Sequence, residues 1–256
     1  MRREEGAMDL RETVAVVTGG TGGLGQCICR ALARAGAHVC VVYKQSHDLA
    51  RQVAQECTQL GPRAEPLQAD VTDQAQIEAL VQRVLDEFGR LDILVNNAAY
   101  NQWIPFKDLE QLTPELWDYI LRYNTTGPFL MIRAVAPVML RQQRGRIVNI
   151  SSVAGLAPGG SSIAYAVSKA ALIHLTRCMA VALAPHVLVN CVAPGLMEGT
   201  RMTARLDPTY VEQARRGTAL MRAADKDDVA DQVVTFCRTD STTGQTVVID
   251  AGRFYH

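Results

Sequence analysis

A phenol and an ammonium group stand four residues apart in the segment Tyr165-Ala-Val-Ser-Lys169. On a helix, this spacing places the two side chains on one face. A free tyrosine has a pKa of about 10 and is therefore a poor acid or base near neutrality. A cation about 4 Å away, at an effective dielectric constant of about 20, contributes roughly 4 kcal/mol, or about three pKa units. The pair predicts a tyrosine that transfers protons near working pH, with a solvated surface pair as the alternative.

Glycines dominate a second candidate site, Gly19-Gly-Thr-Gly-Gly-Leu-Gly25, which follows an apolar run and precedes a helical pattern. Glycines at a strand–helix turn permit a tight bend and let a pyrophosphate come close to the backbone. The first turn of the helix then offers N–H groups and a partial positive charge. The string lacks the Gly-Lys-Ser/Thr ending of a nucleoside triphosphate loop. The string therefore favours a dinucleotide as ligand over a nucleoside triphosphate, and it favours a binding loop over a plain turn.

The elements that must position these groups alternate along the chain. Short β-branched runs predict strands at residues 13–18, 38–43, 64–69, 91–95, 146–150, 187–192 and 246–249. Helical patterns lie at residues 26–35, after the second strand to about 60, and at 72–88, 113–142, 162–183 and 225–238. Gly127-Pro128 and Pro137 should bend or divide the region 113–142. Strands this uniformly apolar are covered on both faces, which predicts a Rossmann-like, doubly wound three-layer α/β/α sandwich with a mostly parallel seven-stranded sheet.

The alternation continues without a linker, so we expect one domain over residues 11–256, after a flexible leader of residues 1–10. Residues 196–218 break the pattern and contain Gly199, Pro208 and Gly217. A loop of this length inside a compact domain is usually functional. We therefore expect it to be a lid over the substrate.

Composition and charge exclude several classes of protein. The 256 residues carry 26 Lys+Arg against 26 Asp+Glu, without the basic surplus expected of a nucleic-acid binder. No apolar run reaches transmembrane length, and the first ten residues lack the apolar core of a signal peptide, so we expect a cytoplasmic protein with no membrane partner. Seven scattered cysteines without a Cys-x-x-Cys pair predict small buried hydrophobes and no metal site.

Several motifs occur together in one order: the glycine string, Asn96-Asn97-Ala98-Ala99, Ser152 thirteen residues before Tyr165, the Tyr-x-x-x-Lys pair, and Pro194-Gly195. From about Val14 to Gly252 the chain resembles the short-chain dehydrogenase/reductase family in its single-domain form. The resemblance implies an NAD(P)-dependent oxidoreductase that acts on CH–OH groups. Within the family, the chain is most similar to 3-oxoacyl-[acyl-carrier-protein] reductases.

The resemblance implies catalytic roles by position. Tyr165 would be the general acid that protonates the carbonyl oxygen during reduction, and Lys169 would lower its pKa and hold the nicotinamide ribose. Ser152 would hydrogen-bond the substrate oxygen, with Ser151 the less favoured neighbour. Asn124 would hold a water for proton relay to the lysine.

The resemblance also implies the cofactor contacts. The phosphate loop would consist of Gly19, Thr21, Gly23, Leu24 and Gly25. The adenine and its ribose would contact Asp70, Val71, Asn97 and Ala98. The nicotinamide end would contact Tyr165, Lys169, Pro194, Gly195 and Thr200.

The choice between NAD and NADP turns on the end of the second strand. Eighteen residues past Gly25, where NAD-preferring relatives have an aspartate, this chain has Tyr43 followed by Lys44. Loss of an acid that binds the 2′-hydroxyl, beside a cation, favours a 2′-phosphate. Gly22 stands where many NADP enzymes have a second basic residue. NADP(H) is therefore favoured, and NAD(H) stays open.

The expected pocket mouth is apolar, with Trp103, Leu156, Met197 and Met202 as its residues. Few fixed polar groups favour a hydrophobic or chain-like ketone. The main hypothesis is therefore NADPH-dependent reduction of a ketone to a secondary alcohol, with a 3-oxoacyl thioester, free or carrier-bound, as substrate. The alternatives are NAD-dependent oxidation of a secondary alcohol, polyol or steroid, and a non-catalytic NADP-binding sensor or scaffold.

Basic residues suggest where a carrier would bind. Arg201 and Arg205 in the expected lid could guide an anionic carrier, and Arg141, Arg144 and Arg146 could receive an acidic carrier protein. The resemblance also implies that the helices near 113–142 and 162–183 pair across subunits. We therefore expect a homotetramer, with a dimer as the alternative.

Overall fold

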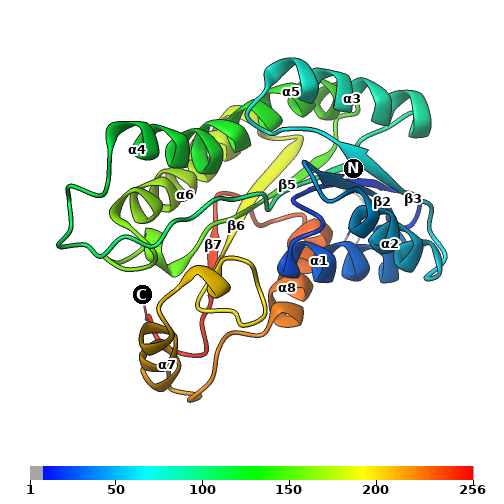
Figure 1. Ribbon diagram of the computed structural model, residues 1–256. Helices are drawn as coiled ribbons and strands as arrows, with labels where there is room; N and C mark the ends of the chain where they lie inside the picture. The colour runs from blue at the N-terminus through cyan, green and yellow to red at the C-terminus, as the bar shows by residue number, and fades with distance from the viewer. Residues whose placement is uncertain (1–7, 256) are drawn as a thin grey trace.

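Parallel strands form the centre of the molecule. The computed structural model describes residues 8–255, and its sheet has the order β3-β2-β1-β4-β5-β6-β7, with every neighbouring pair parallel (Figure 1). The strands are β1 (Val14–Thr18), β2 (His38–Tyr43), β3 (Ala64–Gln68), β4 (Ile93–Asn96), β5 (Gly145–Ile150), β6 (Val187–Pro194) and β7 (Thr246–Ile249). The strand order runs outward from β1 in one direction and from β4 in the other, which confirms the doubly wound fold.

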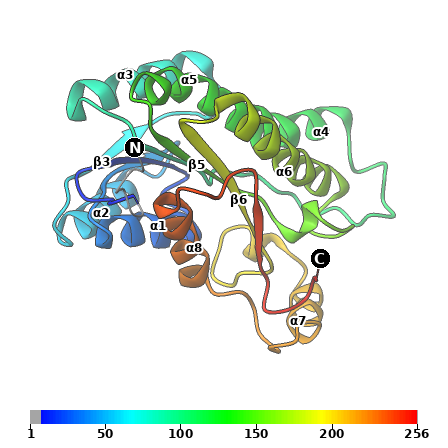
Figure 2. The ribbon, with the colours of Figure 1, turned by 180° about the vertical axis from the view of Figure 1, so that it is seen from behind.

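Helices cover both faces of this sheet (Figure 1 and Figure 2). One face carries α1 (Gly23–Arg34), α2 (His47–Thr58) and α8 (Lys226–Arg238). The other carries α3 (Gln74–Phe88), α5 (Gly127–Arg141) and α6 (Ile163–Leu183), with α4 (Pro114–Leu121) against α6. The short α7 (Pro208–Arg216) lies apart from both layers, close to the C-terminal end of the chain.

The strands are uniformly apolar because their alternate side chains enter two different cores. In β1, Ala15 and Val17 pack with α1, α2 and α8, whereas Val14 and Val16 pack with α3, α5 and α6. A strand with water on one face would show polar residues at every second position instead. Six of the seven cysteines are buried, as expected of small hydrophobes, and Cys178 is exposed.

Two helices begin at residues other than those predicted. α1 begins at Gly23, three residues early, because the glycines that disfavour a free helix are needed here for close packing. α3 is capped by Asp73 and not by Thr72. The Asp73 carboxylate accepts a hydrogen bond from Gln76 N over 3.2 Å, whereas the Thr72 hydroxyl donates to Asp70 over 2.8 Å.

The predicted helical region 113–142 is divided once. Thr113 caps α4 as expected and accepts a hydrogen bond from Leu116 N over 3.3 Å. A π-helical turn, Arg122–Thr126, joins α4 to α5 at the expected Gly-Pro step. Pro137 lies inside α5 and does not end it. The missing N–H of Pro137 removes only one hydrogen bond of the helix. The helix continues because α5 packs against the sheet on both sides of this position.

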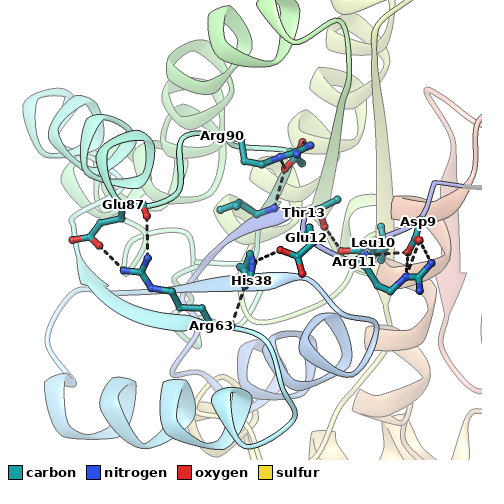
Figure 3. Close-up of polar contacts among 11 residues, drawn as sticks. Asp9, Leu10, Arg11, Glu12, Thr13, His38, Arg63, Glu87 and Arg90 are labelled. Carbon is teal, nitrogen blue, oxygen red and sulfur yellow. Dashed lines mark hydrogen bonds and ion pairs between the residues drawn. The ribbon is translucent and has the colours of Figure 1, made fainter.

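The first described residues pack into the core. This contradicts part of the prediction that residues 1–10 form a flexible leader. Met8 and Leu10 are buried, and Met8 N donates to Arg238 O over 2.7 Å at the end of α8. Between them, the Asp9 carboxylate accepts hydrogen bonds from Arg11 (Figure 3). A flexible leader therefore cannot include residues 8–10, and the rest of that prediction lies outside the described residues.

Polar contacts occupy the amino ends of the strands (Figure 3). His38, at the start of β2, has its Nε2 3.4 Å from a Glu12 carboxylate oxygen and accepts a hydrogen bond from Arg63 N over 2.9 Å. The Asp92 carboxylate accepts a hydrogen bond from Val14 N over 2.9 Å. These side chains close this end of the sheet, and the carboxyl ends of the strands remain for a ligand.

One described helix, α6, is long and apolar enough to cross a membrane by length and composition alone. It packs instead against β6 and buries Tyr165 and Lys169. A core helix passes the same test of length and composition, so this is weak evidence for a membrane span.

Candidate active site

A cavity of about 450 Å³ opens at the carboxyl ends of β1 and β4, where the strand order reverses. In open α/β sheets, ligands bind in the crevice at this switch point. The cavity is lined by the glycine loop after β1, by Ser152 after β5, and by Tyr165 and Lys169 of α6. The structure thus brings the two candidate sites of the sequence into one space.

The glycine loop is packed too closely for side chains at two of its positions. A Cβ on Gly25 would stand 2.2 Å from Gly19 O, and a Cβ on Gly23 would stand 2.8 Å from Gly199 O. Within the described residues, no side chain caps α1 at Gly22, so its first N–H groups are available to a ligand. The loop therefore fits the pyrophosphate of a dinucleotide, held by backbone N–H groups and the helix charge.

Thr18 and Asn97 clamp this loop to the end of β4. The Thr18 hydroxyl accepts hydrogen bonds from Asn97 N over 3.0 Å and from Ala98 N over 3.1 Å. The Asn97 amide donates in return to Thr18 O and Gly19 O. The side chain of Asn97 is therefore used in positioning the phosphate loop, a role that the sequence did not suggest.

Tyr165 and Lys169 are buried at the cavity, which excludes a solvated surface pair. Lys169 Nζ lies 5.8 Å from the centre of the Tyr165 ring and donates a hydrogen bond to Ile150 O over 2.8 Å. Ser162 caps α6 and accepts from Tyr165 N over 3.2 Å, so the phenol stands on the first turn of the helix.

Burial shifts the pKa values of both groups, and that of Tyr165 moves opposite to the predicted direction. Burial raises the pKa of Tyr165 to about 12, and a hydrogen-bonding interaction with the Ser152 hydroxyl partly opposes this shift. Burial also lowers the pKa of Lys169 to about 8. Burial outweighs the hydrogen bond from Ser152, so among the protein's own groups the pKa of the phenol does not move toward neutrality as predicted. The phenol is protonated at neutral pH.

The two serines after β5 differ in their surroundings. The Ser151 hydroxyl donates to Lys169 O over 2.8 Å and is buried. The Ser152 hydroxyl accepts a hydrogen bond from Ala154 N over 3.2 Å and interacts with the phenol of Tyr165. Ser152 is thus the serine that faces the candidate acid.

Asn124 lies in the π-helical turn behind the cavity and is fully buried. Its amide nitrogen donates to Tyr100 O over 2.9 Å and to Ser168 Oγ over 3.0 Å, and its oxygen accepts from Tyr100 N over 2.8 Å. The side chain is not part of the described cavity wall. It holds Tyr100, which is part of that wall.

The end of β2 carries the groups expected to read the adenosine ribose. Tyr43 and Lys44 line the cavity, but Asp70 and Val71 are not among the described residues that do so. Lys44 Nζ lies 2.7 Å from an Asp70 carboxylate oxygen and 5.3 Å from the centre of the Tyr123 ring. The charge of Lys44 is therefore already offset by a partner.

The other cofactor positions predicted by resemblance all line this cavity. They are Thr21, Leu24, Asn97, Ala98, Pro194, Gly195 and Thr200, together with the glycines. The Thr200 hydroxyl accepts a hydrogen bond from Thr203 N over 3.1 Å, and it thus supports a turn of the segment 196–218.

Residues 196–218 contain more structure than the expected loop, because they include α7 and the 3₁₀ turn Thr203–Arg205. Contacts of Tyr210 and Met202 dock this segment on the body of the protein. The ring of Tyr210 lies 5.1 Å from that of Trp103, and its hydroxyl accepts a hydrogen bond from Gly160 N over 3.2 Å. Asn101 Nδ2 donates to Met202 O over 3.3 Å.

The predicted pocket mouth is placed only in part at the cavity. Met197 and Met202 line it, whereas Trp103 and Leu156 are not among its described lining residues. Trp103 packs against Tyr210, and Leu156 is 37% exposed. An aromatic ring near a lid can serve as its docking partner, and the sequence could not distinguish that use from contact with a substrate.

The cavity wall also includes residues for which no role in the site was predicted, among them Gln45, Ser46, Ser161, Tyr210, Arg253 and Phe254. The last two belong to the C-terminal segment after β7. The Asp250 carboxylate holds this segment by accepting hydrogen bonds from Arg253 N over 3.1 Å and from Phe254 N over 2.8 Å. An aspartate that directly follows a strand, two residues before a glycine, is a recognised turn signal, and it could have indicated this return of the chain.

Comparison with known proteins agrees with this geometry. Residues 13–211 match the model of the short chain dehydrogenase family. A Streptomyces violaceoruber protein, named as ketoacyl reductase 2 of the granaticin polyketide synthase, is 39% identical over 93% of this chain and 95% of its own. A 3-oxoacyl-[acyl-carrier-protein] reductase of Synechocystis is 37% identical over 95% of this chain and 97% of its own.

Among solved structures, the NADPH-dependent 3-quinuclidinone reductase of Rhodotorula rubra superposes with a TM-score of 0.88 at 26% identity. The match covers 96% of this chain and 92% of that one. Within the described residues, no group of three or more His, Cys, Asp or Glu side chains could hold a metal ion. The chain, an NAD(P)-dependent oxidoreductase, belongs to the short chain dehydrogenase family.

Proposed function

We propose that the protein uses NADPH to reduce a ketone to a secondary alcohol, with a 3-oxoacyl thioester or a similar hydrophobic carbonyl as substrate. One observation carries the proposal: the glycine loop that fits a pyrophosphate lines the same cavity as Ser152, Tyr165 and Lys169. When bound, the reduced nicotinamide supplies a hydride to the carbonyl carbon.

The side chains would supply the proton and the charge stabilisation. Because the pKa of Tyr165 is raised to about 12, its phenol is protonated at neutral pH and can act as the general acid toward the carbonyl oxygen. The Ser152 hydroxyl would donate a hydrogen bond to the same oxygen as negative charge develops. The ammonium group of Lys169 would stabilise the phenolate that remains and hold the nicotinamide ribose. Asn124 remains the predicted holder of a relay water.

We favour NADP(H) over NAD(H) as the cofactor. A ribose 2′-hydroxyl is normally bound by a carboxylate at the end of the second strand, and Tyr43 stands there instead. Lys44 follows it and lines the cavity. These two residues support a 2′-phosphate.

A hydrophobic carbonyl is favoured because Met197, Met202 and Leu206 line the cavity. The proposal of a carrier-bound substrate rests on relatives that are named as ketoacyl and 3-oxoacyl reductases. Arg146 does not contribute to a carrier surface, because it is buried and paired with Asp240.

We also propose a homotetramer, with a dimer as the alternative, and a cytoplasmic location. Exposed apolar side chains on α5 and α6 support contacts between subunits; they include Phe129, Val167 and Val181. Light scattering of the purified protein measures the number of subunits.

The test of the activity is nicotinamide consumption by purified protein with a 3-oxoacyl thioester, with NADPH and NADH side by side. Rapid loss of NADPH alone supports the proposal. Turnover only of alcohols with NAD⁺ would support a dehydrogenase instead. Binding of both cofactors without turnover over a panel of ketones and alcohols would support a sensor or scaffold.

A variant separates chemistry from binding. Tyr165→Phe should lower turnover by about 10²- to 10⁴-fold and leave the Kd for NADPH unchanged. Tyr255→Phe, at an exposed position outside the described cavity wall, is the control. Unchanged turnover in Tyr165→Phe would contradict the mechanism.

A further inference from the structure

The lid reaches across the cavity to the start of α2. Arg201 Nη2 donates a hydrogen bond to Ser46 Oγ over 3.0 Å, between residues 155 positions apart in the chain. Both residues line the cavity, and Ser46 lies two residues after Lys44. Just before Arg201, the lid passes over the phosphate loop, where Gly199 O is 2.8 Å from the position of a Cβ on Gly23.

The charges at this end of the cavity are unequally compensated. Lys44 is paired with Asp70 at 2.7 Å, and this hydrogen-bonded contact raises the pKa of the lysine. Arg201, in contrast, forms no ion pair within the described part of the chain, and it donates a hydrogen bond to the neutral Ser46 hydroxyl. Arg201 is therefore a cation whose charge is available to an anion at the β2–α2 end of the cavity.

We infer that Arg201 and Ser46 together bind the 2′-phosphate of NADP(H), so that the cofactor itself fastens the lid. The inference rests on the proposed use of this cofactor. An arginine near the end of the second strand suits a 2′-phosphate, because a planar guanidinium can make two hydrogen bonds to phosphate oxygens. The Ser46 hydroxyl makes no capping bond to α2, a helix of 12 residues whose N-terminus adds partial positive charge.

The same contact links the two ends of the cavity. Arg201 lies on the segment whose residues Met197, Met202 and Tyr210 line the cavity. A phosphate held between Arg201 on the lid and Ser46 on the body binds more tightly to the protein with a docked lid than to the protein with an open lid. By linkage, it must then favour the docked state, whereas NAD(H) lacks the group that makes this contact.

Arg201 was a candidate guide for an anionic substrate carrier on sequence grounds. Its contact with Ser46 turns the guanidinium toward the β2–α2 connection, which also carries Tyr43 and Lys44. The cofactor's phosphate is therefore the anion that this geometry favours, and a role with the carrier becomes an outcome of the test.

The experiment uses fragments that contain only the adenosine end of the cofactor. Calorimetry gives the Kd of 2′,5′-ADP and of ADP for the wild type, Arg201→Gln and Arg216→Gln. The control removes the same charge from the same segment, at a residue that pairs with Glu212 over 2.7 Å and is not among the described cavity residues. Hydrogen exchange of residues 199–214 reports whether the lid is docked.

We expect wild type and Arg216→Gln to bind 2′,5′-ADP more tightly than ADP. In both proteins, 2′,5′-ADP but not ADP should slow hydrogen exchange in the lid. Arg201→Gln should weaken 2′,5′-ADP and NADPH about 10- to 100-fold, leave ADP and NADH unchanged, and lose the protection of the lid.

Three results would overturn the inference. If the wild type prefers NADPH but Arg201→Gln binds it equally well, the proposed cofactor stands and the role of Arg201 fails. If Arg201→Gln changes only the KM of an acyl thioester, the arginine serves the substrate. If the wild type shows no preference for NADPH over NADH, the proposed cofactor and the inference fail together.

Discussion

Lys169 donates its hydrogen bond to the backbone carbonyl of Ile150, over 2.8 Å, at the last residue of β5. The ammonium group is thereby held at the cavity by the sheet itself. It is also buried, which lowers its pKa from 10.5 to about 8. Among the groups proposed for the reaction, this one titrates closest to neutrality.

The pH dependence of ketone reduction should therefore report Lys169. A lysine is charged below its pKa, so the ammonium that stabilises the phenolate is lost as the pH rises through about 8. We expect kcat/KM to fall above that pH, measured with saturating cofactor between pH 6 and pH 10. Tyr165, with its pKa of about 12, does not titrate in this range. A profile that stays flat to pH 10 would contradict this assignment.

Replacing the lysine should change how stability depends on pH. Between pH 8 and 10.5 the folded wild type binds fewer protons at this site than the unfolded chain, so its stability rises through that window. Below pH 8 the full penalty of burying the charge, about 3 kcal/mol, is present. Lys169→Met removes that penalty, and its stability relative to wild type should be greater at pH 7 than at pH 10.

Urea titrations at the two pH values measure this difference. The lost hydrogen bond to Ile150 O lowers the stability of the variant at both pH values, by about 1–3 kcal/mol. Lys107→Met, at an exposed position, is the control and should show no such change between the two pH values. A pH-independent difference for Lys169→Met would mean that the lysine is not buried as described.

The two adjacent serines offer a matched test of catalysis. Ser152→Ala removes the hydroxyl that would bind the developing oxyanion, and kcat should fall by about 10²- to 10³-fold. Ser151→Ala removes the hydrogen bond to Lys169 O and should lower the free energy of unfolding by about 1 kcal/mol while turnover persists. Steady-state kinetics and urea denaturation of both variants distinguish these outcomes. The opposite order of effects would assign the catalytic role to Ser151.

The phosphate loop should not tolerate a methyl group at Gly25. A Cβ there would stand 2.2 Å from Gly19 O, so Gly25→Ala must move the backbone of the loop away from its present position. We expect a loss of about 1–3 kcal/mol of stability and a raised Kd for NADPH. Gly159→Ala, whose Cβ would meet nothing within 4 Å, is the control. Equal binding of NADPH by Gly25→Ala and wild type would show that this packing is not needed.

Local patterns were enough to predict most of the fold. The strands 38–43 and 246–249 have the predicted limits, because short apolar runs between turn residues leave little choice of boundary. The N-cap at Thr113 was also predictable, since a threonine before a proline is a strong local signal. The start of α1 was not, because Gly23 and Gly25 are required by contacts with residues distant in the chain or in the preceding turn.

The site was predictable in its residue types and less so in its electrostatics. Spacing alone puts Tyr165 and Lys169 on one face of a helix. It does not indicate that both groups are buried, which raises the pKa of the tyrosine and lowers that of the lysine. The pairing of Lys44 with Asp70 joins two strand ends whose side chains meet only in the folded protein. Motifs specify which groups are present, and packing decides their charge and partners.

The turn made by Asp250 affects how the protein can be engineered. This carboxylate holds Arg253 and Phe254, and both residues form part of the cavity wall. A bulky group attached close to Phe254 would therefore stand at the wall of the pocket. At the other end, Met8 is anchored to Arg238, and neither residue belongs to the described wall. A bulky group attached close to Met8 would therefore lie away from the residues that form the described wall of the pocket.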